Sequence, residues 1–509
     1  MDREYIVAID LGDSNIVVGV GSAAEGGRIN IDHILTRPSE GVSMGQIMNI
    51  DQAVNTIRKA LDELCDTTGI EAKEVYAGIS GEFIYCTSHT DHVFVPDHKN
   101  GVTKQVVEAL YERMSNVLVS EERIIMERIP QRYVINDTTE VEDPVGVFGS
   151  PLSSTFNFIS SDNVPLGRLD MALRRLNIIP RRTFSNAMVV GDAVLSPDEM
   201  EEGVVVVDIG GELTDIAIYH RNILRYISTI PMGAKSFNND IRTLTIPERY
   251  IEPLKLKYGC ALSKHAPQDF TVIIKGRSKH DQREIAIYNL AAVIEARARD
   301  IAELVSKEIA DSGFADKVPY GIVLTGGSAQ LRFLDELFRE VTGMEVRVAE
   351  AEEVISPQTR TRISSSADST IVGLLLHGLK YGPCKVNIDE SKMTPPPPPV
   401  IKEKPKEIKV EVVKEVPEEV VKEVVKEETP QVQPPLPPKV VVPRPINTVQ
   451  QNVVAEPEVA PEVKSETAPP KKRVEEAEKP KKRRILKLFS SLVNNVNTHF
   501  DVGEDDEEV

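Results

Sequence analysis

Two short segments of the sequence combine an aspartate with glycine and small polar residues. They read Asp10-Leu11-Gly12-Asp13-Ser14-Asn15 and Asp208-Ile209-Gly210-Gly211-Glu212-Leu213-Thr214-Asp215. Glycine lets backbone N–H groups approach an anion closely, and an aspartate at a strand end can hold Mg²⁺ against phosphate groups. Each segment therefore fits a phosphate-binding turn, with Asp10 and Asp208 as candidate Mg²⁺ ligands. One such turn alone is more often a plain hairpin, whereas two of them roughly 200 residues apart favour a shared role.

A third glycine turn, Leu324-Thr325-Gly326-Gly327-Ser328, lies further along the chain. We expect a strand over 322–324 before it and, after it, a helix with Leu331, Leu334, Leu337 and Phe338 on one face. The glycine pair would let a purine and ribose pack against the backbone at the start of that helix. The alternative is an ordinary turn leading into a helix, with Ser328 as its N-cap.

The elements that must position these turns follow an α/β pattern. Apolar β-branched runs alternate with amphipathic helical patterns from residue 1 to about 383, as expected for an α/β fold. Tyr5–Ile9 and Ile16–Val20 are predicted strands on either side of the first turn, and Val204–Asp208 and Asp215–Tyr219 repeat this arrangement around the second. Ile50–Cys65 is a predicted helix.

Composition limits the class of protein. The chain has 509 residues with 27% charged and 41% hydrophobic residues, which is ordinary for a soluble protein. A net charge of −19 argues against a dedicated nucleic-acid binder. The four cysteines lack metal-ligand spacing and indicate reduced thiols. The start does not have the pattern of a secretory signal, and no run reaches the roughly 18 apolar residues of a spanning helix, so we expect any membrane contact to be peripheral.

The C-terminal part of the sequence differs from the rest. Residues 384–480 hold more than half of the chain's 34 prolines, together with many Lys, Glu and Val. Such a segment cannot bury a core, and we predict an extended, charged, disordered linker.

Residues 481–500 are predicted to form a basic amphipathic helix. Four cations, Lys481, Lys482, Arg483 and Arg484, precede an apolar stripe formed by Ile485, Leu488, Phe489, Leu492, Val493, Val496 and Phe500. This pattern is typical of a helix lying in the interface of an anionic membrane. The alternatives are a helix that docks on the protein or on a partner, and a basic nucleic-acid arm, although aromatics for stacking are not interleaved with the cations. The acidic residues 501–509 would be repelled by anionic lipid.

In their order, the three glycine turns resemble those of the actin, sugar-kinase and heat-shock chaperone ATPase superfamily. Within it, the chain is most similar to the FtsA family of bacterial cell-division proteins over residues 5–382. The segments that carry this resemblance are Gly203–Tyr219, Ile230–Gly233, Lys257–Leu262, Gly321–Leu331, Ile129–Ile135 and Pro144–Gly146. The last two lie where the FtsA family has its characteristic insertion.

The resemblance implies an actin-like two-lobed α/β fold with duplicated ribonuclease-H-like cores and a small inserted subdomain. It divides the chain into a first lobe over 1–83 and 164–197, an insertion over 84–163, and a second lobe over 198–383 with an outer subdomain near 241–315.

The resemblance also implies ATP and Mg²⁺ between the lobes. The implied nucleotide-binding residues are Asp10, Gly12, Asp13, Ser14, Asn15, Asp208, Gly210, Gly211, Glu212, Thr214, Glu252, Lys255, Gly326, Gly327 and Ser328. Of these, Glu252 and Lys255 match a pair that contacts adenosine, the alternative being a solvated helix face. Two positions depart from the family, which usually has Thr at 13 and Gly at 212. A carboxylate facing a triphosphate is repelled unless Mg²⁺ lies between them, the alternative being that both side chains point to solvent. We expect binding through backbone N–H groups and slow or absent hydrolysis.

The family role implied for the chain is to polymerise and to tether the tubulin-like FtsZ ring to the cytoplasmic face of the inner membrane at the septum. The outer subdomain would capture the C-terminal tail of FtsZ, and later division proteins would be further partners. Three alternatives share the fold: a pilus-assembly actin-like scaffold, a sugar or acetate kinase, and a chaperone ATPase. The kinase would need a catalytic base and a substrate pocket, and the chaperone a following β-rich substrate domain.

Overall fold

Two five-stranded sheets of identical topology form the framework of the protein. The computed structural model describes residues 4–96, 101–275, 282–363 and 365–392, so the predicted helix over 481–500, the acidic end and nearly all of the predicted linker lie outside the described residues. In one sheet the strand order is β12-β7-β1-β2-β3, and in the other it is β19-β18-β13-β14-β15. In both orders the first three strands are parallel to one another, and the last two strands each pair antiparallel with the strand before them. The duplicated core that the sequence predicted is therefore present.

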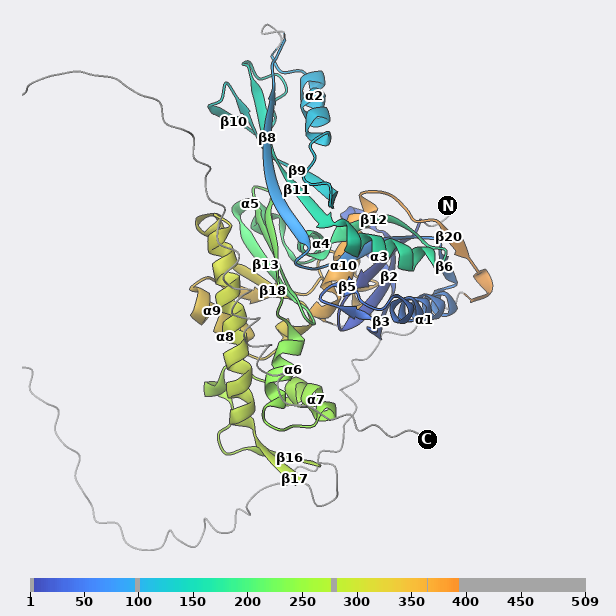
Figure 1. The fold of residues 1–509 in the computed structure, drawn as a ribbon, viewed down its shortest axis with the longest axis vertical. Helices are drawn as coiled ribbons and strands as arrows, with labels where there is room; N and C mark the ends of the chain where they lie inside the picture. Colours follow the sequence, from blue (N-terminus) through green and yellow to red (C-terminus); the bar gives the residue numbers. More distant parts are fainter. Residues whose placement is uncertain (1–3, 97–100, 276–281, 364, 393–509) are drawn as a thin grey trace, which may run out of the picture. The chain divides into compact units, whose positions relative to one another are not determined.

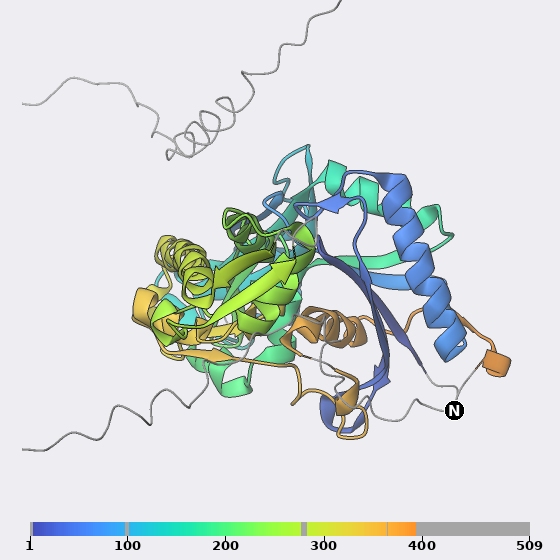
Figure 2. The same cartoon turned by 90° about the horizontal axis from the view of Figure 1, so that it is seen from below.

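The first lobe contains the first of these sheets and the helices around it. Its elements are β1 (Ile6–Leu11), β2 (Asn15–Ala23), β3 (Ile29–Pro38), the hairpin β4 (Val42–Ser43) and β5 (Gln46–Ile47), α1 (Ile50–Thr68), β6 (Ile70–Ala72), β7 (Glu74–Ile79), α3 (Asn163–Arg174) and β12 (Ile179–Ser185). Helix α1 is capped at its start by the side chain of Asn49 and ends at Gly69, whose φ is +72°. It lies along the sheet in Figure 2 and buries Ile57 and Leu64 against it.

The second lobe contains the matching sheet. Its elements are α5 (Pro197–Glu202), β13 (Val204–Ile209), β14 (Thr214–His220), β15 (Ile223–Ile230), α6 (Ala234–Arg242), α7 (Glu248–Tyr258), the hairpin β16 (Thr271–Lys275) and β17 (Gln282–Ala286), α8 (Ile287–Asp311), β18 (Ile322–Thr325), α9 (Leu334–Thr342) and β19 (Val346–Val348). All six residues of β13 are buried, as expected for a central strand covered on both faces. Helices α8 and α9 pack beside each other (Figure 1).

A four-stranded antiparallel sheet is inserted between β7 and α3. Its order is β10-β9-β11-β8, formed by β8 (Ile84–Val93), β9 (Arg123–Ile135), β10 (Thr139–Val141) and β11 (Leu152–Asp162), with α2 (Lys104–Ser115) beside it (Figure 1). The insertion also contacts the second lobe: the Gln131 side chain donates to Leu224 O, and Asn157 donates to Arg225 O.

Two helices cross where the lobes meet. Helix α4 (Asn186–Val194) follows β12 and contacts the second sheet, whereas α10 (Ser369–Leu379) contacts β1, β2 and β7 of the first. Their backbones approach so closely that a Cβ on Gly373 would lie 2.3 Å from Val189 O. Glycine is therefore required at this crossing. After α10 the chain returns to the first lobe, where β20 (Val386–Ile388) pairs with β6.

The predicted elements match the structure at six places and differ at one. The predicted strands around the first two turns, the helix over 50–65 and the strand over 322–324 correspond to β1, β2, β13, β14, α1 and β18. After the third turn, however, a short 3₁₀ helix spans Gly327–Gln330 and α9 begins only at Leu334. Phe333 has a φ of +62° and separates the two helices, so Ser328 is not the N-cap of the long helix. Within the described residues, no helix is long and apolar enough to cross a membrane.

Candidate functional site

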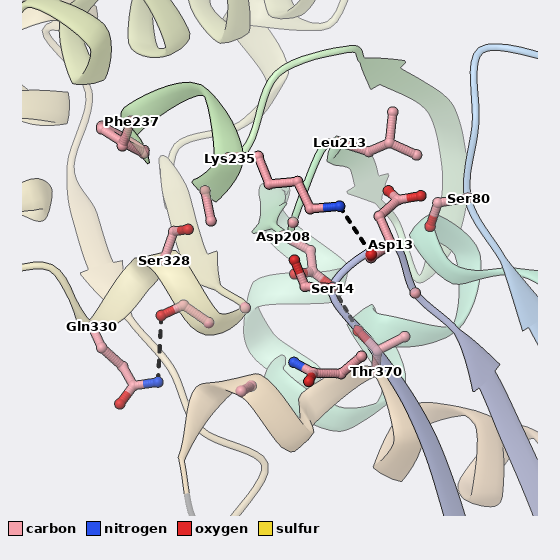
Figure 3. A pocket seen from close by; sticks show the side chains of 18 of the residues that line it. Asp13, Ser14, Ser80, Asp208, Leu213, Lys235, Phe237, Ser328, Gln330 and Thr370 are labelled. Atoms are coloured by element: carbon pink, nitrogen blue, oxygen red, sulfur yellow. Dashed lines mark hydrogen bonds between the residues drawn. The ribbon is translucent and has the colours of Figure 1, made fainter. Parts of the chain in front are cut away.

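The glycine turns meet around a cavity of about 700 Å³. The first turn follows β1 and the second follows β13, and a Cβ on Gly211 would lie 2.3 Å from Ser14 Oγ. Residues of the third turn, which follows β18, line the same cavity. In Figure 3, Asp13, Ser80 and Lys235 lie toward one end of the cavity, and Ser328 and Gln330 lie toward the other. Segments from positions near 10, 210 and 326 are thus brought together, as the sequence predicted.

Four carboxylates surround the end formed by the first two turns. They belong to Asp10, Asp13, Asp208 and Asp215, all of which line the cavity. Burial raises the pKa of Asp10 to about 7, and the neighbouring Asp208 and Asp215 carboxylates add to the rise against a hydrogen bond from Asn186. Burial likewise raises the pKa of Asp215 to about 7, and it raises those of Asp13 and Asp208. A divalent cation here would relieve this repulsion.

The two predicted Mg²⁺ ligands are fixed by side chains on different helices. Asn186 at the start of α4 donates its Nδ2 hydrogen to Asp10 Oδ1 at 2.8 Å. Thr370 in α10 donates to Asp208 Oδ2 at 2.6 Å. The Oδ1 atom of Asn186 is buried without a hydrogen-bond partner. One oxygen of each aspartate is therefore held, and an unused acceptor lies beside Asp10.

Asp13 and Glu212, the two departures from the family pattern, are both held by other groups. Asp13 Oδ1 accepts a hydrogen bond from Gly45 N–H at 2.7 Å. Glu212 accepts hydrogen bonds from the 43–44 segment and from Lys235, and it is not among the residues that line the cavity. Thr214 is fully buried outside the cavity, where its hydroxyl donates to Met232 O. Of the predicted nucleotide-binding residues, Glu212 and Thr214 are the two that do not face it.

The third turn leaves open space at the other end. Gly326 has φ +87° and ψ 172°, and an added Cβ would lie 2.2 Å from Asp208 Oδ1. At Gly327 the nearest atom to an added Cβ is Ala367 Cβ at 3.9 Å, so a side chain there would project into free volume. Ser328 Oγ is buried without a partner and lines the cavity. An unused hydroxyl beside an open glycine fits a polar ligand with a flat ring.

Helix α7 supplies the predicted Glu252 and Lys255 at this end. Lys255 is only 9% exposed, and its Nζ donates to Asn238 Oδ1 at 2.9 Å and pairs with Glu252 at 2.8 Å. A solvated helix face would leave the lysine in water, so that alternative does not describe Lys255. Leu256, which is 70% exposed, adds an apolar surface at the cavity.

Several residues of the cavity were not predicted. Asn186, Thr370 and Ser80 hydrogen-bond to aspartates that lie 176, 162 and 135 positions away in the chain, so local patterns carried no signal for them. Lys235 was also missed. It is the second residue of α6, which begins directly after Gly233, and a cation at the start of a helix is well placed to meet a bound anion. The predicted membrane-binding residues 481–496 lie outside the described residues.

The arrangement can hold a phosphorylated ligand together with a divalent cation. Backbone N–H groups of two glycine turns, the ammonium of Lys235 and the acidic cluster lie at one end. The open glycine, Lys255 and Leu256 lie at the other. The length and polarity of the site therefore match a nucleotide better than an isolated phosphate.

Comparisons with known proteins agree with this description. A family model for "Cell division protein FtsA" matches residues 205–370, and one for "SHS2 domain inserted in FTSA" matches residues 81–160. Cell division protein FtsA of Pseudomonas aeruginosa is 31% identical over 380 residues, covering 74% of this chain and 90% of the relative. FtsA of Escherichia coli K12 is 28% identical over 389 residues, covering 74% and 91%. FtsA of Bacillus subtilis is 30% identical over 351 residues, covering 68% and 79%.

Among solved structures, a chain of the PilM–PilN type IV pilus biogenesis complex has a similar fold. The TM-score is 0.50 at 14% identity, and the match covers 74% of this chain and 98% of that chain. At this identity the likeness concerns the fold alone. The described residues have the mixed α/β, actin-like fold that the sequence predicted.

Proposed function

The chain belongs to the FtsA family of cell-division proteins, and from this premise we propose that it binds ATP with Mg²⁺ between its lobes and links the FtsZ ring to the cytoplasmic face of the inner membrane. The proposal of nucleotide binding rests on one observation, which is that all three glycine turns line the same cavity. The family membership and the matched insertion at 81–160 support the division role.

The nucleotide would be held chiefly by backbone groups and fixed side chains. Gly12, Gly210 and their neighbours would present N–H groups to the phosphates. Asp10 and Asp208 would hold Mg²⁺, which in nucleotide sites usually takes one or two carboxylates together with phosphate oxygens and water. Gly327 and Lys255 would receive the adenosine. When bound, the metal would neutralise charge shared by the phosphates and the acidic cluster.

Hydrolysis is proposed to be slow or absent. Both oxygens of Glu212 accept hydrogen bonds from Ser43, Met44 and Lys235, and Glu212 does not line the cavity. Asp13 lines the cavity, but its Oδ1 is held by Gly45 N–H. Asp215 faces the cavity, but both of its oxygens already accept hydrogen bonds, from Ser80 and Thr229. Two of the roughly four acceptor sites of this carboxylate are therefore already in use, which leaves fewer for orienting a water molecule.

The membrane part of the proposal rests on the sequence of residues 481–500. A single amphipathic helix with a basic lead-in binds anionic lipid weakly, because each cation near the surface contributes about 1 kcal/mol. Protomers associated in a row would present many such helices together, which converts weak single contacts into stable attachment. The proline-rich segment before the helix would let the ring stand away from the bilayer.

FtsZ is proposed to bind the outer part of the second lobe, near residues 241–315. That region comprises α7, the β16–β17 hairpin and α8. Later division proteins are further proposed partners, and no nucleic acid is expected to bind.

The test in solution is fluorescence anisotropy of labelled FtsZ titrated with the full chain. We expect binding to FtsZ and much weaker binding to FtsZ that lacks its C-terminal tail. A variant chain lacking residues from 481 onward should bind FtsZ as the full chain does, because the helix is assigned to lipid. No binding of intact FtsZ would refute the tether role and favour a scaffold for another membrane assembly.

A further inference from the structure

The carboxylate of Glu212 connects the second lobe to the first. Its Oε2 accepts hydrogen bonds from Met44 N–H at 2.6 Å and from Ser43 Oγ at 2.8 Å, and its Oε1 accepts one from Lys235 Nζ at 2.8 Å. Ser43 and Met44 belong to the β4–β5 hairpin of the first lobe, whereas Glu212 and Lys235 belong to the second. One side chain therefore bridges the lobes beside the cavity; we call this set of contacts the Glu212 clasp.

The Glu212 carboxylate is the shielded, charged member of the clasp. The Glu212 side chain is 17% exposed, against 42% for Lys235. Burial raises the pKa of Glu212, but hydrogen bonds from Lys235, Met44 and Ser43 outweigh it, so the pKa is lowered overall. Glu212 is thus ionised at neutral pH. It holds the ammonium of Lys235, which also donates to Asp13 O at 3.1 Å (Figure 3) and lines the cavity.

The Asp215 carboxylate, at the end of the second glycine turn, contacts the same surface of the first lobe as Glu212. Asp215 accepts a hydrogen bond from the hydroxyl of Ser80, at the end of β7. This surface is compact, because a Cβ on Gly45 would lie 1.8 Å from Ser80 O. Glu212 and Asp215, both in the second lobe, therefore contact one surface of the first lobe, formed by residues 43–45 and Ser80.

We propose that Glu212 is a built-in anion that holds the cavity closed, so that the site takes nucleoside diphosphate and triphosphate with similar affinity. The inference rests on the proposed nucleotide site and specifies its substrate class. It makes the closed arrangement of the turns a property of the protein rather than of the terminal phosphate.

The physical reason lies in what a terminal phosphate can add. A ligand shifts an equilibrium between open and closed forms only through its different affinity for the two. Where the closed form is already favoured, bridging the turns with one more phosphate brings little further gain. The ammonium of Lys235 is also occupied by Glu212, and an added phosphate charge would be repelled by the Asp13 and Glu212 carboxylates.

The first arm of the test uses the full chain without nucleotide. Hydrogen exchange of the segment 42–47 is compared between the natural protein and Glu212→Gly, with Glu212→Gln as a variant that keeps an acceptor and loses the charge. Exchange should be at least about tenfold faster in Glu212→Gly and intermediate in Glu212→Gln. The control is Glu202→Gln on the exposed end of α5, which should leave exchange unchanged. Equal exchange in Glu212→Gly and the natural protein would overturn the clasp.

The second arm measures Kd for Mg·ATP and Mg·ADP by fluorescence of labelled nucleotides. The natural chain should bind both within about threefold of each other, and Glu212→Gly should prefer ATP by at least about tenfold. A tenfold preference already present in the natural chain, or a ratio unchanged in Glu212→Gly, would overturn the proposal. If no variant binds either nucleotide, the proposed nucleotide function fails, and the exchange experiment alone decides whether the clasp exists.

Discussion

Two adjacent glycines in the third turn should respond to substitution in opposite ways. At Gly327 the nearest atom to an added Cβ is Ala367 Cβ at 3.9 Å. Gly327→Val should therefore change the free energy of unfolding by less than about 1 kcal/mol, because valine has no worse a helix propensity than glycine and no close contact opposes its Cβ. At Gly326, a backbone at φ +87° and ψ 172° costs a non-glycine residue about 1–3 kcal/mol.

The clash at Gly326 adds to that strain. A Cβ there would lie 2.2 Å from Asp208 Oδ1 and 2.7 Å from Ile209 O, and overpacking of this kind costs about 1–3 kcal/mol. Gly326→Ala should then destabilise the protein by roughly 2–6 kcal/mol in total. The difference between neighbouring positions is large enough to measure by urea unfolding without nucleotide.

Valine at position 327, which should leave stability almost unchanged, should weaken nucleotide binding. If adenosine packs on this turn, valine at 327 denies it about 60–100 Å² of apolar contact, which costs roughly 1.5–2.5 kcal/mol at about 25 cal/mol per Å². Kd for Mg·ATP should then rise roughly 10- to 70-fold. Gly167→Val is the matched control, because Gly167 lies in α3, away from the cavity, with open space around it. An unchanged Kd in Gly327→Val would refute the placement of adenosine at the third turn.

Two further predictions concern single side chains of the cavity. Burial raises the pKa of Asp215 from 3.8 to about 7, so its contribution to stability is full below pH 4 and is lost as pH rises through about 7. The loss is at most about 4 kcal/mol. Asp215→Asn should accordingly unfold at higher urea than the natural protein at pH 8, with a gap that shrinks toward pH 5; a gap independent of pH would contradict the burial argument. Lys255→Met keeps the aliphatic stem and should weaken Mg·ATP binding about tenfold with stability within about 1 kcal/mol, whereas unchanged affinity would remove Lys255 from the site.

The parts of the fold that depend on local pattern were predictable. Both predicted phosphate-binding turns are short segments between strands, and glycine and aspartate mark where each strand ends. The helix after the third turn was placed too early, because apolar spacing does not show that Phe333 adopts a left-handed backbone conformation. Apolar periodicity reports which face is buried, and it says little about where the backbone breaks.

The interactions that depend on distant segments were not predictable. Glu212 was expected to face a phosphate or solvent, and instead it binds Ser43, 169 positions earlier in the chain. Thr214 was assigned to the ligand from its place in the turn, yet its hydroxyl bonds to Met232 O under the sheet. In both cases the hydrogen-bond partner of a polar side chain beside a glycine turn belongs to another segment, which only the tertiary fold brings close.

The proposed tether should bring FtsZ to a membrane, and co-flotation with lipid vesicles measures this. Vesicles of phosphatidylglycerol and phosphatidylethanolamine are mixed with FtsZ, Mg·ATP and either the full chain or a version cut before Lys481. We predict that FtsZ floats with the full chain alone and that raising the salt concentration weakens the effect, since the basic lead-in acts through charge. FtsZ left at the bottom while the full chain floats, or equal flotation with the shortened chain, would contradict the claim.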